Sequence, residues 1–273
     1  MMKVYRSIVV NLIAFLMATS AIAARTNIPK ADFSKIATFD RLRCTLTFLT
    51  PTVGITAAHC AAVSTVLVSN KEQGADYIPI EKVVIHPMYR ESGTIGFNVP
   101  TNILGPYFIK KWPYDLALVK LSRPARTTID IFGNLGDVVP LTGPEIHLDF
   151  NGMQKHEKVI VISLGQDGSK PLQKIDLTVK RKANKGELIV IADDSSDQLL
   201  PGDSGSPIFR ETEGSTYELV GIVSSGFLNK PFYEIPTFQH TPRNEDISKQ
   251  AFIIDLASSK DWVETTLKEL SNH

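Results

Sequence analysis

The sequence predicts an all-β protein with one α-helix at its C-terminal end. Most of the chain consists of short runs of β-branched and aromatic residues separated by turn-forming residues, and a credible helical spacing of apolar residues occurs only near the end. Many short strands without intervening helices indicate antiparallel sandwiches or barrels. The length of 273 residues allows one large domain or two modest ones.

Ten strand-like runs follow one another along the chain. They lie at residues 36–39, 45–49, 65–68, 83–85, 116–119, 159–162, 175–179, 188–191, 207–209 and 219–223. The stretch from Ser122 to Pro144 contains three prolines and several glycines, so we expect it to connect two halves. Residues 87–113 contain four prolines and are expected to form a long irregular loop.

The expected helix lies in the last sixteen residues of the chain. Apolar or small residues recur there at helical spacing, at positions 262, 263, 266, 267 and 270. Ser258 with Asp261 resembles a capping box, although glutamate or glutamine is the stricter requirement at the second position. We expect this helix to pack on a barrel.

Residues 1–23 have the three regions of a secretory signal peptide. Lys3 and Arg6 supply the positive charge, an apolar run follows, and Ala21 and Ala23 form a small-x-small cleavage signal. A membrane anchor is the alternative, but a spanning helix needs about 20 apolar residues and this run is about half as long. We therefore expect cleavage near Ala23, a secreted or periplasmic protein, and no membrane span in the mature chain.

Charge and cysteine content narrow the partners further. Lysine plus arginine equals aspartate plus glutamate at 29 each, which argues against a main role in binding nucleic acid or anionic lipid. Two cysteines exclude a disulfide-dense scaffold and a four-cysteine zinc site, but they can form one bridge. We expect no cofactor and no metal, because the remaining histidines show no ligand spacing: His86, His147, His156, His240 and His273.

Three local sequences point to chemistry: TAAHC at 56–60, DLALVKL at 115–121 and GDSGSP at 202–207. Each alone has an ordinary structural explanation, as a structural histidine, a strand-edge aspartate or a turn. Together they hold a complete set for nucleophilic catalysis. Histidine can take the proton of a serine hydroxyl near neutral pH, and a carboxylate can fix the histidine tautomer. Glycines beside the serine let the turn present its amides to an oxyanion.

The order of these motifs resembles that of the trypsin-like serine peptidases of the chymotrypsin fold. Further similarity lies in HPMY at 86–89, in the strand at 219–224 and in the C-terminal ending, so the resemblance covers about residues 36–270. It implies two six-stranded antiparallel β-barrels followed by a C-terminal α-helix. The N-terminal barrel would span residues 24–135 and the C-terminal barrel residues 136–273, with the active site in the cleft between them.

The resemblance also implies a role for each motif residue. Ser204 would attack the scissile carbonyl, and His59 would act first as general base and then as general acid. Asp115 would orient His59, and the amides of Gly202 and Ser204 would form the oxyanion hole. The substrates would then be proteins or peptides.

Similarity to the family also suggests a disulfide and part of a substrate site. Cys44 and Cys60 bracket His59 as the loop disulfide of the family does. Ser224, Ser225 and Gly226 would form the short edge that pairs with the substrate backbone, a form of β-strand addition. In the family, a serine at the position of Ser224 bonds the triad aspartate.

The chain departs from the family at its start. The usual mature Ile-Val-Gly-Gly start is absent, whereas in many members its freed amino group pairs with the aspartate before the nucleophile, here Asp203. Lys35-Ile36 is the nearest imitation, but the local pattern at Ile36 indicates a first strand. A mature start near Ala24 is the expectation, and because an unpaired buried carboxylate is costly, Asp203 needs another partner. Ser206 replaces the more usual second glycine, with little expected effect.

These observations favour a secreted serine endopeptidase that works through a serine–histidine–aspartate triad and an acyl-enzyme. The alternative is a catalytically silent or zymogen-like binding protein on the same fold, since fold alone does not imply function. All three triad residues are present, which favours the enzyme. The oligomeric state and the natural substrate remain open.

Specificity for basic residues is not expected. The position that holds aspartate in trypsin-type pockets, six before the nucleophile, is Gln198 here. A neutral side chain cannot pair with a substrate lysine or arginine. Cleavage-site profiling with a peptide library should therefore show no preference for these residues at the position before the scissile bond. A profile dominated by arginine or lysine would contradict this prediction.

Overall fold

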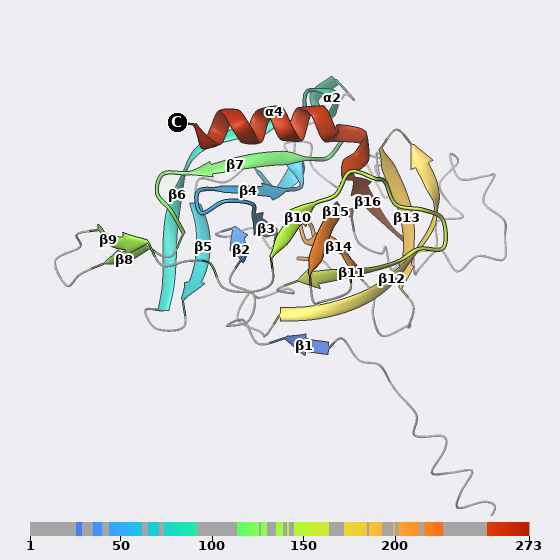
Figure 1. The fold of residues 1–273 in the computed structure, drawn as a ribbon, viewed down its shortest axis with the longest axis horizontal. Coiled ribbons are helices and arrows are strands. Elements are labelled where there is room, and N and C mark those ends of the chain that lie inside the picture. The colour runs from blue at the N-terminus through green and yellow to red at the C-terminus, as the bar shows by residue number, and fades with distance from the viewer. Residues whose placement is uncertain are drawn as a thin grey trace, which may run out of the picture.

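The computed structural model describes residues 26–28, 35–39, 44–61, 65–70, 74–91, 114–125, 127–129, 135–138, 141, 145–163, 172–184, 186–192, 199, 202–212, 216–225 and 250–272. These residues form two large β-sheets, a small two-stranded sheet and a long C-terminal helix (Figure 1). The expected signal peptide, 1–23, and most of the expected loop 87–113 lie outside the described residues. Among the helices described, none is long and apolar enough to cross a membrane.

The first large sheet is a closed antiparallel barrel with the strand order β2-β3-β4-β7-β6-β5. Its strands are β2 (Ile36–Phe39), β3 (Thr45–Phe48), β4 (Val53–Thr56), β5 (Thr65–Asn70), β6 (Gly74–Ile85) and β7 (Ala117–Leu121). Every residue of β3, β4 and β7 is buried. One face of these strands lines the barrel, while the other lies against the C-terminal helix or the second sheet. This double burial explains why β4 and β7 do not alternate polar and apolar residues, whereas β3 alternates threonine with leucine and phenylalanine.

The second large sheet also curls on itself. Its strands are β1 (Thr26–Ile28), β10 (Ile146–Leu148), β11 (Lys158–Ser163), β12 (Leu172–Asn184), β13 (Glu187–Ala192), β14 (Pro207–Glu211), β15 (Tyr217–Ser225) and β16 (Gln250–Asp255). Six of them run in the order β12-β11-β14-β15-β16-β13, and β12 pairs again with β13. The predicted fold class is confirmed, with one local difference: β10 pairs with β15 in parallel.

Two short segments do not follow the expected division into an N-terminal barrel at 24–135 and a C-terminal barrel at 136–273. Strand β1 precedes the first barrel in sequence but pairs with β12 of the second sheet. The expected boundary falls inside β9 (Leu135–Val138), which pairs with β8 (Thr127–Ile129) in a separate ribbon. Figure 1 shows this ribbon projecting beyond the first barrel. The proline- and glycine-containing stretch between the halves thus carries a small hairpin of its own.

Strand β11 shows how the two sheets share their cores. Val159 and Val161 belong to the core inside the second sheet, whereas Ile160 and Ile162 belong to a core continuous with the first barrel. Successive side chains of a strand point to opposite faces. Because both faces of β11 are buried, the sequence VIVI is continuously apolar. The two sheets are therefore joined by a packed apolar layer.

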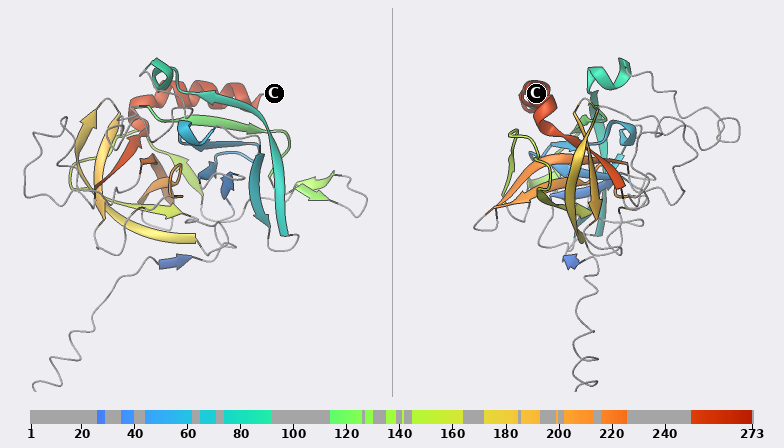
Figure 2. Two further views of the ribbon diagram at one scale, coloured as in Figure 1. Left: turned by 180° about the vertical axis from the view of Figure 1, so that it is seen from behind. Right: turned by 90° about the vertical axis from the view of Figure 1, so that its right-hand side faces the viewer.

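The C-terminal helix crosses from one half of the molecule to the other. Helix α4 (Lys260–Ser271) follows β16 of the second sheet through the 3₁₀ turn η7 (Leu256–Ser259), but it lies on β4 and β7 of the first barrel (Figure 2). Val263 and Leu270 are buried in the first core, as the helical spacing predicts. The expected capping box is wrong, because Ser259 is the N-cap without a side-chain bond and Ser258 donates to the Asp255 carbonyl instead.

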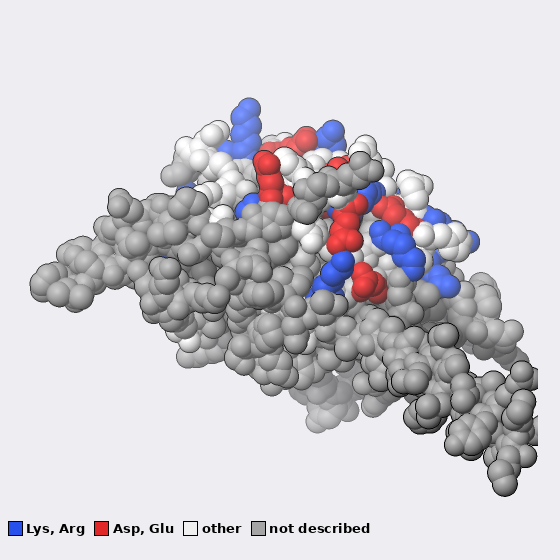
Figure 3. Space-filling model, turned by 60° about the horizontal axis from the view of Figure 1, so that its bottom comes forward, with Lys and Arg blue, Asp and Glu red and all other residues white. Residues whose placement is uncertain are grey.

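Charged side chains of both signs occur side by side on the described part of one face (Figure 3). Arg210 of β14 is a cation that lies among three carboxylates. Its guanidinium bonds Asp149, Glu157 at 2.7 Å and Glu218 at 3.4 Å. A single cation among three carboxylates reduces their mutual repulsion. This network fixes the loop before β11 against β14 and β15.

A cluster of aromatic rings, His86, Tyr114 and Trp262, packs α4 beside the short helix α2 (Pro87–Glu91). The His86 ring stacks on Tyr114 with centroids 4.7 Å apart, and Trp262 of α4 meets it at 4.8 Å in a tilted contact. The Met88 amide donates to His86 Nδ1 at 3.2 Å, so this nitrogen carries a lone pair rather than a proton. Burial lowers the pKa of His86 from its usual 6.5 to about 4. The neutral ring is thus a structural element, as the sequence suggested.

The lowered pKa of His86 predicts an acid-sensitive stability. Between pH 6.5 and about 4, His86 is protonated in the unfolded chain but remains neutral in the folded chain. The free energy of unfolding therefore falls as the pH falls. We expect this group to contribute a loss on the order of 2 kcal/mol over that range. Urea unfolding at pH 7 and pH 4.5 should show a larger loss for the unchanged chain than for His86→Phe, which keeps a ring against Tyr114 and Trp262. Equal losses would contradict the assignment.

Candidate active site

His59 and Asp115 are brought together at one end of the first barrel. His59 lies in the 3₁₀ turn η2 (Ala58–Cys60), directly after β4, and Asp115 lies just before β7, which pairs with β4. The distance between His59 Nδ1 and Asp115 Oδ2 is 2.7 Å, and the His59 amide donates to Asp115 Oδ1 at 2.9 Å. Asp115 is fully buried, whereas the His59 side chain is 13% exposed. Both carboxylate oxygens are thus engaged by the same histidine.

A third donor to this carboxylate comes from the second sheet. The Ser224 hydroxyl of β15 donates to Asp115 Oδ2 at 2.7 Å. Hydrogen bonds to a buried carboxylate compensate its lost hydration and favour its charged form. With Nδ1–H donating to Asp115, His59 keeps the lone pair of Nε2 available for a proton. Burial, together with the smaller effect of the charge of Asp115, raises the pKa of the Tyr89 phenol above its usual value.

Tyr114 shapes the chain immediately before Asp115. Its φ of 61° lies in the left-handed region, which is uncommon for a bulky side chain. The stacking on His86 and packing against the small cluster of Ala58, Ala61, Tyr89 and Ala117 hold it there. No local pattern around Tyr114 indicates this conformation, because only the neighbouring elements impose it.

Ser204 lies on a tight turn that precedes β14. Gly202 and Gly205 flank it with φ values of 110° and 78°, so the expectation that glycines permit unusual dihedrals is met at both positions. The Ser206 amide donates to the Asp203 carbonyl at 3.0 Å, which closes the turn. Among the described residues, the amides of Gly202 and Ser204 have no acceptor.

The first barrel presses directly on this turn. The Thr45 amide of β3 donates to the Ser204 carbonyl at 2.8 Å, and the Gly205 amide donates to Val223 of β15 at 2.8 Å. A Cβ added at Gly205 would collide with the Thr45 carbonyl and the Thr56 hydroxyl. Glycine is thus required at 205 for its positive φ and for close backbone approach. Contacts between the two sheets consequently set the position of Ser204.

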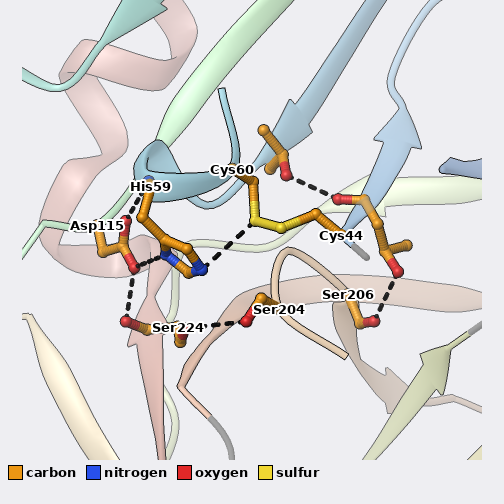
Figure 4. The surroundings of a disulfide bond; sticks show 9 residues. Cys44, His59, Cys60, Asp115, Ser204, Ser206 and Ser224 are labelled. Carbon is orange, nitrogen blue, oxygen red and sulfur yellow. Dashed lines mark hydrogen bonds and ion pairs between the residues drawn. A yellow bond between two sulfur atoms is a disulfide. The ribbon is translucent and has the colours of Figure 1, made fainter. Parts of the chain in front are cut away.

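Figure 4 shows Asp115, Ser224 and Ser204 near the His59 ring. In this structure the Ser204 hydroxyl donates to the Ser224 carbonyl at 3.5 Å, and His59 Nε2 lies 3.5 Å from Cys60 Sγ. The first distance is at the outer limit for a hydrogen bond between oxygens, and the second joins a lone-pair nitrogen to a disulfide sulfur that carries no proton, so neither contact holds its group firmly. Catalytic hydrogen bonds are often long or misaligned before substrate binds.

The predicted disulfide between Cys44 and Cys60 is present, with the Cα atoms 5.9 Å apart. It joins the start of β3 to the turn that carries His59, and closing this loop contributes about 3 kcal/mol in the chain-entropy account. The ligand atoms of Cys44, His59 and Cys60 lie within 4.8 Å of one another. Because the two sulfurs are bonded to each other, no thiolate is available there for a metal ion.

The predicted substrate-binding residues are described only in part. Ser224 is buried, and its hydroxyl points to Asp115 rather than outward. Ser225 ends β15, and its backbone pairs with Phe252 of β16. Gln198 and Gly226 lie outside the described residues. The sequence predicted that Asp203 needs a partner, and one such partner is Ser163. Ser163 lies at the end of an apolar strand, where no feature of the sequence distinguishes it.

Comparison with known families agrees with this architecture. Residues 25–239 match the model of the Trypsin family, a range that contains His59, Asp115 and Ser204. No curated protein matches the chain. Strand β16 and helix α4 lie beyond the matched range, although β16 completes the second sheet and α4 covers the first barrel. With most of its length matched and with the two curled β-sheets of that fold, this chain belongs to the trypsin family.

Proposed function

We propose that the protein is a secreted serine endopeptidase with Ser204 as nucleophile, His59 as general base and Asp115 as the residue that orients His59. The observation that carries this proposal is the buried Asp115 carboxylate, which accepts hydrogen bonds from His59 and from Ser224 of the other sheet. This arrangement presents Nε2 as a base near a serine on a tight, glycine-containing turn (Figure 4). Membership of the trypsin family supports the same reaction class.

The proposed reaction proceeds in two stages. His59 Nε2 takes the proton of Ser204 Oγ while that oxygen attacks the substrate carbonyl, and Asp115 stabilises the resulting imidazolium. The amides of Gly202 and Ser204 would bind the oxyanion. His59 then returns the proton to the leaving amine as the peptide bond breaks. Water, activated by the same histidine, hydrolyses the acyl-enzyme and regenerates the Ser204 hydroxyl.

The proposed reaction requires a small movement of the Ser204 side chain from its position in this structure. The Ser204 hydroxyl must leave the Ser224 carbonyl and turn toward His59 Nε2. A bond 3.5 Å long is weak, so the barrier to this rotation is low. The same contact also supports the second candidate, a zymogen-like or silent protein, because in it Ser204 is not activated.

We also propose a cellular location and a class of substrate for the protein. The Cys44–Cys60 disulfide is typical of an oxidising compartment, and with the predicted signal peptide 1–23 it supports a secreted or periplasmic location after cleavage near Ala23. Proteins or peptides are the proposed substrates. The equal numbers of basic and acidic residues give no support for a nucleic acid partner.

An active-site fluorophosphonate probe tests whether Ser204 is an activated nucleophile. The secreted chain should be labelled, Ser204→Ala should not be labelled, and His59→Ala should react at least about a thousandfold more slowly because the base is lost. Protein mass spectrometry and gel fluorescence measure the label. A folded, unchanged chain that stays unlabelled would favour the silent or zymogen-like alternative and overturn the proposal.

Ser224→Ala tests the contribution of the second sheet to the Asp115 carboxylate. Losing a hydrogen bond to a buried charge costs about 1.5 to 3 kcal/mol, so we expect kcat/KM for a peptide ester to fall at least tenfold. Ser122→Ala, at an exposed serine just after β7, is the matched control and should remain within twofold. If Ser224→Ala retains full kcat/KM, the Ser224 bond has no part in orienting the triad.

A further inference from the structure

Asp203, the residue directly before Ser204, is fully buried, and its side chain is held by a neighbouring strand. Ser163, the last residue of β11, donates from Oγ to Asp203 Oδ1 at 2.5 Å. Ser163 is fully buried as well. A short hydrogen bond to a buried carboxylate stabilises that carboxylate where water cannot reach it. The bond therefore anchors the side chain of Asp203 to the second sheet.

The backbone of Asp203 is fixed at the same time. Its carbonyl accepts the Ser206 amide at 3.0 Å, and its peptide unit joins Gly202 to Ser204. These are the two residues whose amides are proposed to bind the oxyanion. With the side chain held by β11 and the carbonyl held within the turn, Asp203 has little freedom to rotate. Because the Asp203 carbonyl and the Ser204 amide share one peptide plane, the direction of the Ser204 N–H bond follows from this constraint.

The first residues of the first barrel are held by contacts within that barrel. Ile36, the nearest imitation of the family's mature start, is buried at the beginning of β2 and pairs with Thr47. The carbonyl of Lys35 accepts the Phe48 amide at 2.8 Å. An amino group freed by cleavage after Lys35 would have to break these contacts before it could reach Asp203.

We propose that Ser163 is a positioning residue for the turn that carries Ser204, and that this turn is assembled without an amino group freed by proteolysis. Ser163 touches neither the substrate nor the reacting atoms; it acts through Asp203. This inference rests on the proposed function, because it concerns the competence of the same serine. It assigns the anchoring of Asp203 to a side chain of β11.

Variants of Ser163 provide the first test. Ser163→Ala should slow fluorophosphonate labelling of Ser204 about tenfold or more, since the loss of one oxyanion donor costs about 10² to 10³ in rate and loosening the turn should cost a part of this. Ser163→Thr keeps the hydroxyl and should remain within about threefold. Ser259→Ala is the matched control, because Ser259 is buried and its hydroxyl has no partner among the described residues.

Kinetics with a peptide ester distinguish positioning from mere structural support. Weaker amide alignment should lower kcat while KM changes less than threefold, because the oxyanion forms only in the transition state. Labelling rates are normalised to the folded fraction measured by circular dichroism. If Ser163→Ala loses thermal stability but labels at the unchanged rate per folded molecule, Ser163 is only structural and the proposal fails.

The second test does not depend on how Ser163 variants fold. Lys35→Gln removes the basic residue before Ile36, and an uncleavable Gly-Ser extension ahead of Ala24 blocks a free amino group at the expected mature start. Both proteins should be labelled within twofold of the unchanged chain. Loss of labelling in either would overturn the proposal while the labelled, unchanged chain still supports an activated Ser204. An unlabelled, unchanged chain would instead overturn the proposed function itself.

Discussion

A carboxylate buried between two β-sheets imposes the strongest constraint on this molecule. Asp115 lies at the end of the first barrel, but its hydrogen-bond donors come from η2 and from β15 of the second sheet. A buried charge is tolerated only when such donors are in place. The two sheets must therefore dock in one relative position before the charge is satisfied. The position of His59 follows from the same requirement, because its backbone and its ring both bind Asp115.

The turn around Ser204 is determined by the same docking. The amide of Thr45, in the first barrel, donates to the Ser204 carbonyl in this turn. The Thr45 hydroxyl accepts a hydrogen bond from the Ser206 hydroxyl at 3.1 Å. The Thr56 hydroxyl donates to the Thr45 carbonyl at 2.7 Å and fills the space that a side chain at 205 would need. A sheet of one half thus shapes the turn of the other.

Much of the fold could be predicted because short β-branched runs have a direct physical meaning. All ten predicted runs fall in strands, apart from the end residues Leu49 and Leu116. Strand β4 was missed because Gly54 weakens its propensity and burial on both faces removes any alternation. Sequence also suggested the residues that meet near His59, whereas the conformation of Tyr114 and the bond from Ser163 depend on packing between distant segments. Such contacts leave no local pattern.

The path of α4 has a consequence for how the chain folds as it is made. The last described segment of the chain covers β4 and β7, which are synthesised some 140 to 210 residues earlier. Until that segment arrives, the apolar outer face of these strands lacks its native cover. Contacts over such sequence separations make folding slow, because a large loop must close before they form. The first barrel therefore remains partly uncovered until the residues of α4 have been synthesised.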